Sequence, residues 1–368
     1  MRLPEPLRSR VLGALQTQEN KGYPYFDSLL AELKSWQSGQ IPALARLAAY
    51  GPEMPAPISL FRDGCLIRPA GGQGTSARSL RFESSGTTAA ERAVHVLEEA
   101  TFYDTAALAW GRAHVLSGAL PSTWLVLVPD PAALPHSSLG HMLATFQRAS
   151  EPKRVCWLGV DQAAVAAKHL VELAKTRQPV AIFATAFALA DALDALPREI
   201  VLAPDSRIMQ TGGYKGRRRA LSFGELAECV DARLGPVSLW SEYGMTELAS
   251  QLYAPDPRSA STRLSAQSDT DQACSPTSPG RVLSFEPHYE APPWVRLTIR
   301  DTRTLAALPQ GREGLIQVDD LANVYGCASI LTEDIGMLTE EGKLLLRGRA
   351  PQSPLRGCSL ASELDETP

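Results

Sequence analysis

The chain has 368 residues, 44% of them hydrophobic, and its 36 basic and 40 acidic side chains leave a formal net charge of −4. This length suits one large α/β domain with a smaller appendage, and such a chain buries roughly three quarters of its unfolded surface. The charge balance gives no reason to expect a nucleic-acid partner, and no stretch reaches the roughly 20 apolar residues of a membrane helix. Because the N-terminus also lacks the apolar core of a secretory signal, we expect a cytoplasmic protein without a membrane partner.

Residues 1–78 predict an N-terminal helical cap of three short helices, because apolar side chains recur there at helical spacing. From residue 79 to 253, strand-like apolar runs alternate with amphipathic helices, which is the pattern of an α/β nucleotide-binding core with parallel strands and helical crossovers. The predicted strands are residues 80–82, 124–128, 155–158, 180–183, 208–210 and 237–240. The predicted helices are residues 89–116, 139–148, 163–174, 187–196 and 223–234.

Residues 254–280 carry Ser, Thr, Pro, Asp and Gln with almost no large apolar side chain, which predicts a flexible loop. Residues 281–350 predict a β-rich subdomain of antiparallel strands. Its predicted strands are residues 294–300, 315–318, 329–332 and 343–346. Residues 351–368, rich in Pro, Ser and acidic side chains, predict a tail that contains Cys358.

The six cysteines are scattered without a CxxC pair or the spacing of metal ligands. In a chain of this size, that distribution favours free thiols over disulfides or a structural metal. They are Cys65, Cys156, Cys229, Cys274, Cys327 and Cys358.

A hydroxyl-rich stretch follows the first predicted strand of the core. Backbone N–H groups and small hydroxyl side chains there can converge on phosphate oxygens without steric obstruction, which predicts a triphosphate cradle. A Ser/Thr turn that caps a helix beginning near Ala89 explains the same residues equally well, and no Walker A loop is present. The stretch consists of Ser84, Ser85, Gly86, Thr87 and Thr88.

A second motif, residues 241–247, combines an aromatic ring, a hydroxyl and a carboxylate within a few positions. In a nucleotide site, Tyr243 and Gly244 would lie against adenine, and Thr246 would reach the α-phosphate. Glu247 would hold a Mg²⁺ ion that bridges phosphate oxygens. The alternative is a strand followed by an ordinary turn.

Further candidates follow later strands. Asp334 suits the ribose hydroxyls and Arg349 the phosphates, although an acidic turn and a surface arginine are the alternatives. The backbone at Gly212 and Gly213 allows close approach of an acyl chain or adenine. Two more residues are candidates for binding the phosphate or the acyl carboxylate, with a helix cap and a charged strand end as their alternatives: His136 and Lys215.

Taken together and in this order, these elements resemble the adenylate-forming superfamily of acyl- and aryl-CoA ligases, peptide-synthetase adenylation domains and luciferases. Within it, the chain is most similar to the LuxE-type acyl-protein synthetases of bacterial bioluminescence. The resemblance covers about residues 79–362. Its matching segments are residues 135–140, 206–217, 242–253, 320–323, 332–336, 348–349 and 356–360.

The resemblance implies an adenylate-forming N-terminal domain fold and an enzyme that activates a fatty or other apolar carboxylic acid with ATP and Mg²⁺. It further implies that the acyl group moves to the thiol of Cys358 and then to a partner reductase that makes an aldehyde. The guanidinium of Arg356 would favour the thiolate of Cys358. An inert buried thiol is the alternative for this cysteine.

The chain departs from the family in two places. Thr88 is followed by residues 89–92, Ala-Ala-Glu-Arg, where the superfamily usually has glycine and a lysine, so Arg92 is a candidate for the cationic role. We expect no counterpart after Gly348 and Arg349 of the small swinging domain that carries a catalytic lysine in most of the superfamily, which fits the LuxE type. Two other functions stay open: an adenylation enzyme that loads CoA or a carrier-protein thiol, and a non-catalytic nucleotide-binding scaffold.

Overall fold

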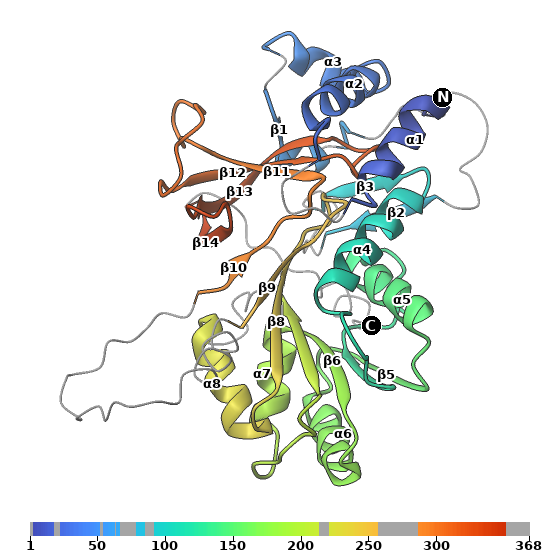
Figure 1. Cartoon of the computed structure of the whole chain (residues 1–368), viewed down its shortest axis with the longest axis vertical. Helices are drawn as coiled ribbons and strands as arrows, with labels where there is room; N and C mark the ends of the chain where they lie inside the picture. Colours follow the sequence, from blue (N-terminus) through green and yellow to red (C-terminus); the bar gives the residue numbers. More distant parts are fainter. Residues whose placement is uncertain are drawn as a thin grey trace, which may run out of the picture.

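The main sheet of the molecule is parallel, as predicted (Figure 1). The computed structural model describes residues 3–17, 23–51, 54–62, 64–66, 79–84, 92–212, 221–256 and 286–350. The sheet has the strand order β5-β4-β6-β7-β8-β9, with only the β8–β9 pair antiparallel. Its strands are β4 (Thr123–Leu127), β5 (Arg154–Leu158), β6 (Val180–Thr185), β7 (Arg207–Thr211), β8 (Ser238–Tyr243) and β9 (Leu252–Pro255).

Helices cover both faces of this sheet, because its strands alternate side chains between two cores. Leu125 and Leu127 join the core shared with α6 (Ala163–Thr176), α7 (Ala186–Asp194) and α8 (Phe223–Leu234). Trp124 and Val126 point the other way, into the core shared with α4 (Thr101–Ala113) and α5 (Ser138–Ser150). The predicted helices over residues 139–148, 163–174, 187–196 and 223–234 are therefore confirmed, with α8 at its predicted residues.

The C-terminal part is an antiparallel sheet in the order β10-β14-β13-β12-β11, which confirms the prediction. Its strands are β10 (His288–Tyr289), β11 (Val295–Arg300), β12 (Gly314–Asp320), β13 (Ser329–Leu338) and β14 (Leu344–Arg349). The fold is thus α/β with an antiparallel C-terminal part. Ala254 and Pro255, at the start of the predicted loop, belong to β9, and residues 257–285 lie outside the described part of the chain.

The N-terminal segment contains the three predicted helices but is more than a helical cap. They are α1 (Glu5–Ala14), α2 (Phe26–Ser38) and α3 (Pro42–Ala48). After them, β1 (Ala56–Pro57) pairs in parallel with β13, and the short 3-10 helix η1 (Ile58–Phe61) follows. The N-terminal segment therefore adds a strand to the C-terminal sheet (Figure 1). The domain boundaries stay a prediction.

The prediction of one helix over residues 89–116 is wrong. The helix α4 begins only at Thr101, and β3 (Val94–Leu97) precedes it. Side chains of β3 alternate between buried and half-buried, which is a strand period, and the strand pairs antiparallel with β2 (Leu80–Glu83). The first predicted strand therefore belongs to a separate two-stranded hairpin and not to the parallel sheet.

Two smaller predictions can be compared with the described residues. Among the described residues, Cys65, Cys156, Cys229 and Cys327 are thiols rather than halves of a disulfide. Across the described ranges, no helix has the length and apolar character needed to cross a membrane.

Gln37 ties the N-terminal helices to the rest of the fold. Its side chain is 1% exposed. Its amide nitrogen Nε2 donates to the carbonyl oxygens of Asn323 at 2.7 Å and Val324 at 2.8 Å. Its Oε1 accepts from the N–H of Ala328 at 3.0 Å.

We expect Gln37→Ala to lower the free energy of unfolding by about 2–3 kcal/mol, because it leaves buried backbone polar groups without a hydrogen-bond partner. Urea unfolding measures this, and the exposed control Gln178→Ala should change stability by less than about 0.5 kcal/mol. An equal change in both variants would contradict the structural role.

Candidate functional site

The best-defined candidate site lies near the carboxyl ends of β7 and β8. In parallel sheets, ligands bind in the crevice outside the carboxyl ends of the strands. Thr211 at the end of β7 lies beside Glu242 near the end of β8. Gly212 follows with a φ of +73°, a left-handed conformation that favours glycine. Residues 244–251 then leave the sheet before β9 begins.

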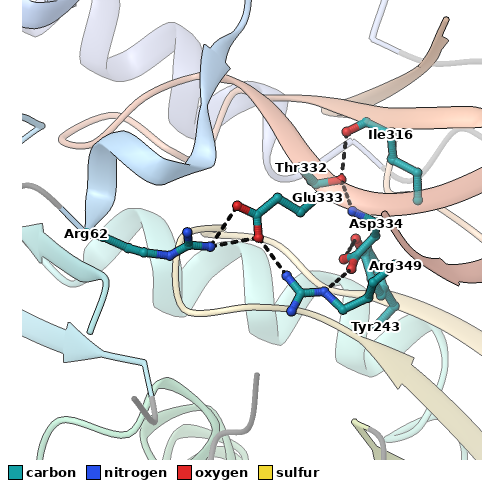
Figure 2. Close-up of polar contacts among 7 residues, drawn as sticks. All are labelled: Arg62, Tyr243, Ile316, Thr332, Glu333, Asp334 and Arg349. Carbon is teal, nitrogen blue, oxygen red and sulfur yellow. Dashed lines mark hydrogen bonds and ion pairs between the residues drawn. The ribbon is translucent and has the colours of Figure 1, made fainter. Parts of the chain in front are cut away.

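Three of the predicted nucleotide-binding residues meet at this edge (Figure 2). The hydroxyl of Tyr243 donates to Oδ2 of Asp334 at 2.8 Å, and Nε of Arg349 donates to Oδ1 of the same carboxylate at 3.2 Å. They come from β8, β13 and β14, so the cluster joins the parallel and antiparallel sheets. Asp334 and Arg349 are also directly opposite each other in the β13–β14 pair.

A β-bulge shapes the strand end that carries Arg349. The register of β13 and β14 shifts between Ile335 and Gly336, which face Gly348 and Leu346. The extra residue lies on β14, and Gly348 has a φ of +120°, which side chains rarely tolerate. On the other strand, Oγ1 of Thr332 accepts from the N–H of Asp334 at 3.2 Å. The bulge and this contact together set the position of the Asp334–Arg349 pair.

Glu333 and Asp334 are part of β13, so the acidic turn that was the alternative to a ribose contact does not form here, and Glu333 has its own contacts. Nη2 of Arg349 donates to Oε2 of Glu333 at 2.9 Å. Nη2 of Arg62, from the N-terminal segment, lies 2.8 Å and 2.7 Å from the two oxygens of the same carboxylate. Two carboxylates and two guanidinium groups therefore form one continuous network, visible in Figure 2. Sequence reasoning did not identify Arg62.

The loop that carries Thr246 and Glu247 is held by its backbone. Nδ1 of His95 lies 2.9 Å from the carbonyl oxygen of Thr246, and Nε2 lies 3.1 Å from Oδ1 of Asn323. Nδ2 of Asn323 donates to the carbonyl oxygen of Glu247 at 2.8 Å. Burial lowers the pKa of His95 to about 4. Since His95 belongs to β3, the β2–β3 hairpin contacts this loop directly.

Asp320 fixes the following residues. Its Oδ1 accepts from the hydroxyl of Ser250 at 2.8 Å and from the N–H of Ala322 at 2.9 Å. Its Oδ2 accepts from the N–H of Ala249 at 3.1 Å. Burial raises the pKa of Asp320 to about 6. The segment 320–323, singled out in the sequence only by its resemblance, thus supports the loop after β8.

Thr246 and Glu247 are placed below the surface. Thr246 is 3% exposed and Glu247 is 0% exposed, so protein atoms cover the carboxylate proposed for Mg²⁺. The roles of both residues stay predictions.

The described end of the hydroxyl-rich stretch lies in the β2–β3 hairpin. The N–H of Ser84 donates to the carbonyl oxygen of Ala93 at 2.9 Å, and Oγ of Ser84 accepts from the N–H of Ala93 at 2.8 Å. The stretch therefore starts on the hairpin whose second strand contacts Thr246. Arg92 lies 3.7 Å from the carboxylate of Glu83, so it is engaged within the hairpin.

His136 supports the hairpin. Its carbonyl oxygen accepts from the N–H of Glu83 at 3.0 Å, and its Nδ1 lies 3.0 Å from the carbonyl oxygen of Arg81. The neighbouring Ser137 caps α5 by accepting from the N–H of Gly140 at 3.0 Å. The cap that was considered for His136 is thus made by the next residue. A ligand contact of His136 stays a prediction.

The remaining site predictions fall on residues that the structure does not describe. They are Ser85, Gly86, Thr87, Thr88, Gly213, Lys215 and Cys358.

Glu242 is a buried acid that sequence reasoning did not single out. Its carboxylate accepts from the hydroxyl of Thr211, and a Cβ on Gly244 would collide with its Oε1. A side chain at position 244 would therefore force this carboxylate to move. Burial raises the pKa of Glu242 to about 7.

We expect Glu242→Gln to stabilise the protein at high pH. The native state keeps a proton that the unfolded chain releases above pH ~4.5, so wild-type stability falls as the pH rises from there to about 7 and is then level. The substitution should raise the free energy of unfolding by about 2–3 kcal/mol at pH ~8 and have little effect at pH ~4.5. Urea unfolding at both pH values measures this difference.

The exposed Glu228→Gln is the matched control for that experiment and should show no such pH dependence. A Glu242→Gln variant with the same stability difference at both pH values would contradict the buried neutral carboxyl group.

The comparisons with known proteins give low similarity throughout. No protein-family model and no curated protein matches the sequence. Solved structures do match: the chain is similar to a long-chain-fatty-acid-CoA ligase from Archaeoglobus fulgidus, with 15% identity, 74% of this chain and 51% of the other covered, and a TM-score of 0.49. It is also similar to the luciferase-like enzyme of the mealworm Zophobas morio, with 12% identity, 78% and 61% coverage, and a TM-score of 0.48.

A third structure is the O-succinylbenzoate coenzyme A synthetase of Bacillus subtilis in complex with ATP and magnesium ion, with 17% identity, 73% and 49% coverage, and a TM-score of 0.46. The chain thus spans between about half and three fifths of the length of these three structures.

Proposed function

We propose that the protein uses ATP and Mg²⁺ to activate a carboxylic acid as its acyl-adenylate. The observation that carries the proposal is the meeting of Tyr243, Asp334 and Arg349, which come from three strands of two sheets. The hairpin that begins the hydroxyl-rich stretch supports it, because His95 of that hairpin contacts the backbone of Thr246.

These residues suit the parts of a nucleotide. The carboxylate of Asp334 accepts hydrogen bonds, as two ribose hydroxyls require. The guanidinium of Arg349 suits phosphate oxygens, and the ring of Tyr243 offers a flat surface for adenine. In the proposal, Glu247 would hold Mg²⁺ once its buried carboxylate becomes exposed to the site, and the ion would supply positive charge at the phosphate oxygens.

The proposed reaction has two steps. An oxygen of the acid attacks the α-phosphorus of ATP, pyrophosphate leaves, and the acyl-adenylate forms. The thiolate of Cys358 then attacks the acyl carbon and AMP leaves, so that the acyl group ends as a thioester. We propose that a fatty or other apolar acid is the substrate and that a partner reductase takes the acyl group. Cytoplasmic localisation belongs to the same proposal.

Pyrophosphate release tests the first step. The purified chain is incubated with ATP, Mg²⁺ and a panel of acids of different chain length, with hydroxylamine present to trap activated acyl groups. The proposal predicts acid-dependent release of pyrophosphate and formation of the matching hydroxamate. ATP binding without either product over the whole panel would instead favour the non-catalytic scaffold.

Adding CoA or a carrier protein to the same reaction identifies the acceptor. Acyl-CoA formation by the Cys358→Ser variant would favour the adenylation enzyme that loads an external thiol. Acylation of the chain itself, without CoA, favours the acyl-protein synthetase.

A further inference from the structure

Arg62 reaches the candidate site from outside the region that carries the sequence motifs. Its guanidinium nitrogen Nη2 lies 2.7 Å and 2.8 Å from the two carboxylate oxygens of Glu333. The same carboxylate accepts from Arg349 at 2.9 Å, and Arg349 also contacts Asp334 at 3.2 Å. The order of charges along this network is therefore positive, negative, positive, negative (Figure 2).

The position of Arg62 is fixed by the chain that precedes it. In the β1–β13 pair, Ala56 lies beside Ile330 and Pro57 beside Leu331, two residues before Glu333. Phe61 is 1% exposed, and its ring packs edge-on against His95 with 5.4 Å between centroids. A short strand and a buried aromatic ring thus hold Arg62 beside the strand that carries both acids.

Among the described residues, Arg62 brings the formal charge of this network to zero. Arg62 and Arg349 carry two positive charges, and Glu333 and Asp334 carry two negative charges. Without Arg62, two carboxylates would share one guanidinium, and both would hold Arg349. With it, Glu333 keeps a counter-charge when Arg349 turns toward another anion.

Partial burial strengthens the ion pair between Arg62 and Glu333. The side chains of Arg62 and Glu333 are 18% and 22% exposed, so water screens their interaction less than that of a fully exposed pair. An arginine also keeps its charge and its planar geometry in such a place, where a lysine offers a point charge.

We propose that Arg62 is a positioning residue for the nucleotide phosphates, supplied by the N-terminal segment. It acts through Glu333: by sharing that carboxylate it leaves Arg349 available to the phosphate groups. This inference rests on the proposed function, because it assigns Arg349 to ATP.

Equilibrium binding of α,β-methylene-ATP with Mg²⁺ tests the inference without turnover. We expect Arg62→Ala to raise the Kd by about fivefold or more, and Arg62→Lys to recover part of the loss. The matched control is Arg8→Ala, which breaks an ion pair with Glu99 of similar exposure, 28% and 25%, far from the site in sequence. Arg8→Ala should bind the nucleotide as the wild type does.

A second substitution separates positioning from a loss of local structure. In the Glu333→Gln variant, the charged group that would hold Arg349 away from the phosphates is gone. Adding Arg62→Ala to this variant should therefore change the Kd by less than about twofold. A loop that merely loses its shape would weaken binding by the same factor in both backgrounds. Arg62→Lys provides the same comparison should the alanine variant fold poorly.

The outcomes separate this inference from the proposed function. If the wild type does not bind the nucleotide, the assignment of Arg349 to ATP fails, and the role of Arg62 fails with it. If the wild type binds and Arg62→Ala binds equally well, only the role of Arg62 is overturned. Equal effects of Arg62→Ala with and without Glu333→Gln also overturn it.

Discussion

Asp334→Ala should lower kcat/KM for ATP by about 10²-fold. The carboxylate accepts from the hydroxyl of Tyr243 and from Nε of Arg349, and in the proposed function it also accepts from ribose. Its removal therefore takes away charged hydrogen bonds to the nucleotide and releases the two side chains that it positions. Acid-dependent exchange of labelled pyrophosphate into ATP measures the loss.

The exposed Asp205→Ala is the matched control and should exchange at the wild-type rate. The exchange rate of Asp334→Asn should lie between those of Asp334→Ala and the control, since asparagine keeps the size of the side chain but not its charge. Wild-type exchange by Asp334→Ala would show that the nucleotide binds elsewhere.

Cys358→Ser should abolish the covalent acyl adduct while pyrophosphate exchange continues. The sulfur is the proposed acceptor, and a serine hydroxyl is a much weaker nucleophile at neutral pH because it is not ionised. Intact-mass measurement after incubation with ATP, Mg²⁺ and the acid detects the adduct. Neutral hydroxylamine should remove it from the wild type, as it cleaves a thioester.

Cys229→Ser controls for the loss of any thiol, because Cys229 is a half-buried cysteine outside any disulfide, and its substitution should leave the adduct intact. An adduct that persists in Cys358→Ser and resists hydroxylamine would contradict acylation of the chain at Cys358. Loss of pyrophosphate exchange in Cys358→Ser would mean that this residue serves the first step instead.

Periodic patterns made much of the fold predictable. The parallel strands and their helices alternate along the chain: β6 is a continuous buried run, whereas α8 has apolar side chains at helical spacing. The cap of α8 is also local, since Ser222 and Glu225 form a capping box at its start. The convergence of Tyr243, Asp334 and Arg349 was predictable for a different reason: the order of their motifs resembles a family that joins them.

Long-range pairs left no such signal. The alanine-rich sequence around β3 suggested a helix, whereas the strand forms because its residues pair with β2 and bury His95. The contact of Arg62 with Glu333 joins residues 271 positions apart, and the local sequence around either residue does not predict the pairing. The buried Glu242 was likewise hidden, because its burial depends on how β7 and β8 lie side by side.

The fate of the acid's oxygen tests acyl-adenylate formation most directly. The protein is incubated with ATP, Mg²⁺ and a carboxylic acid whose two oxygens are a heavy isotope, and the nucleotide product is examined by mass spectrometry. Attack of the acid on the α-phosphorus predicts AMP that carries one heavy oxygen atom. Unlabelled AMP, or ADP as the product, would contradict activation of the acid by adenylation.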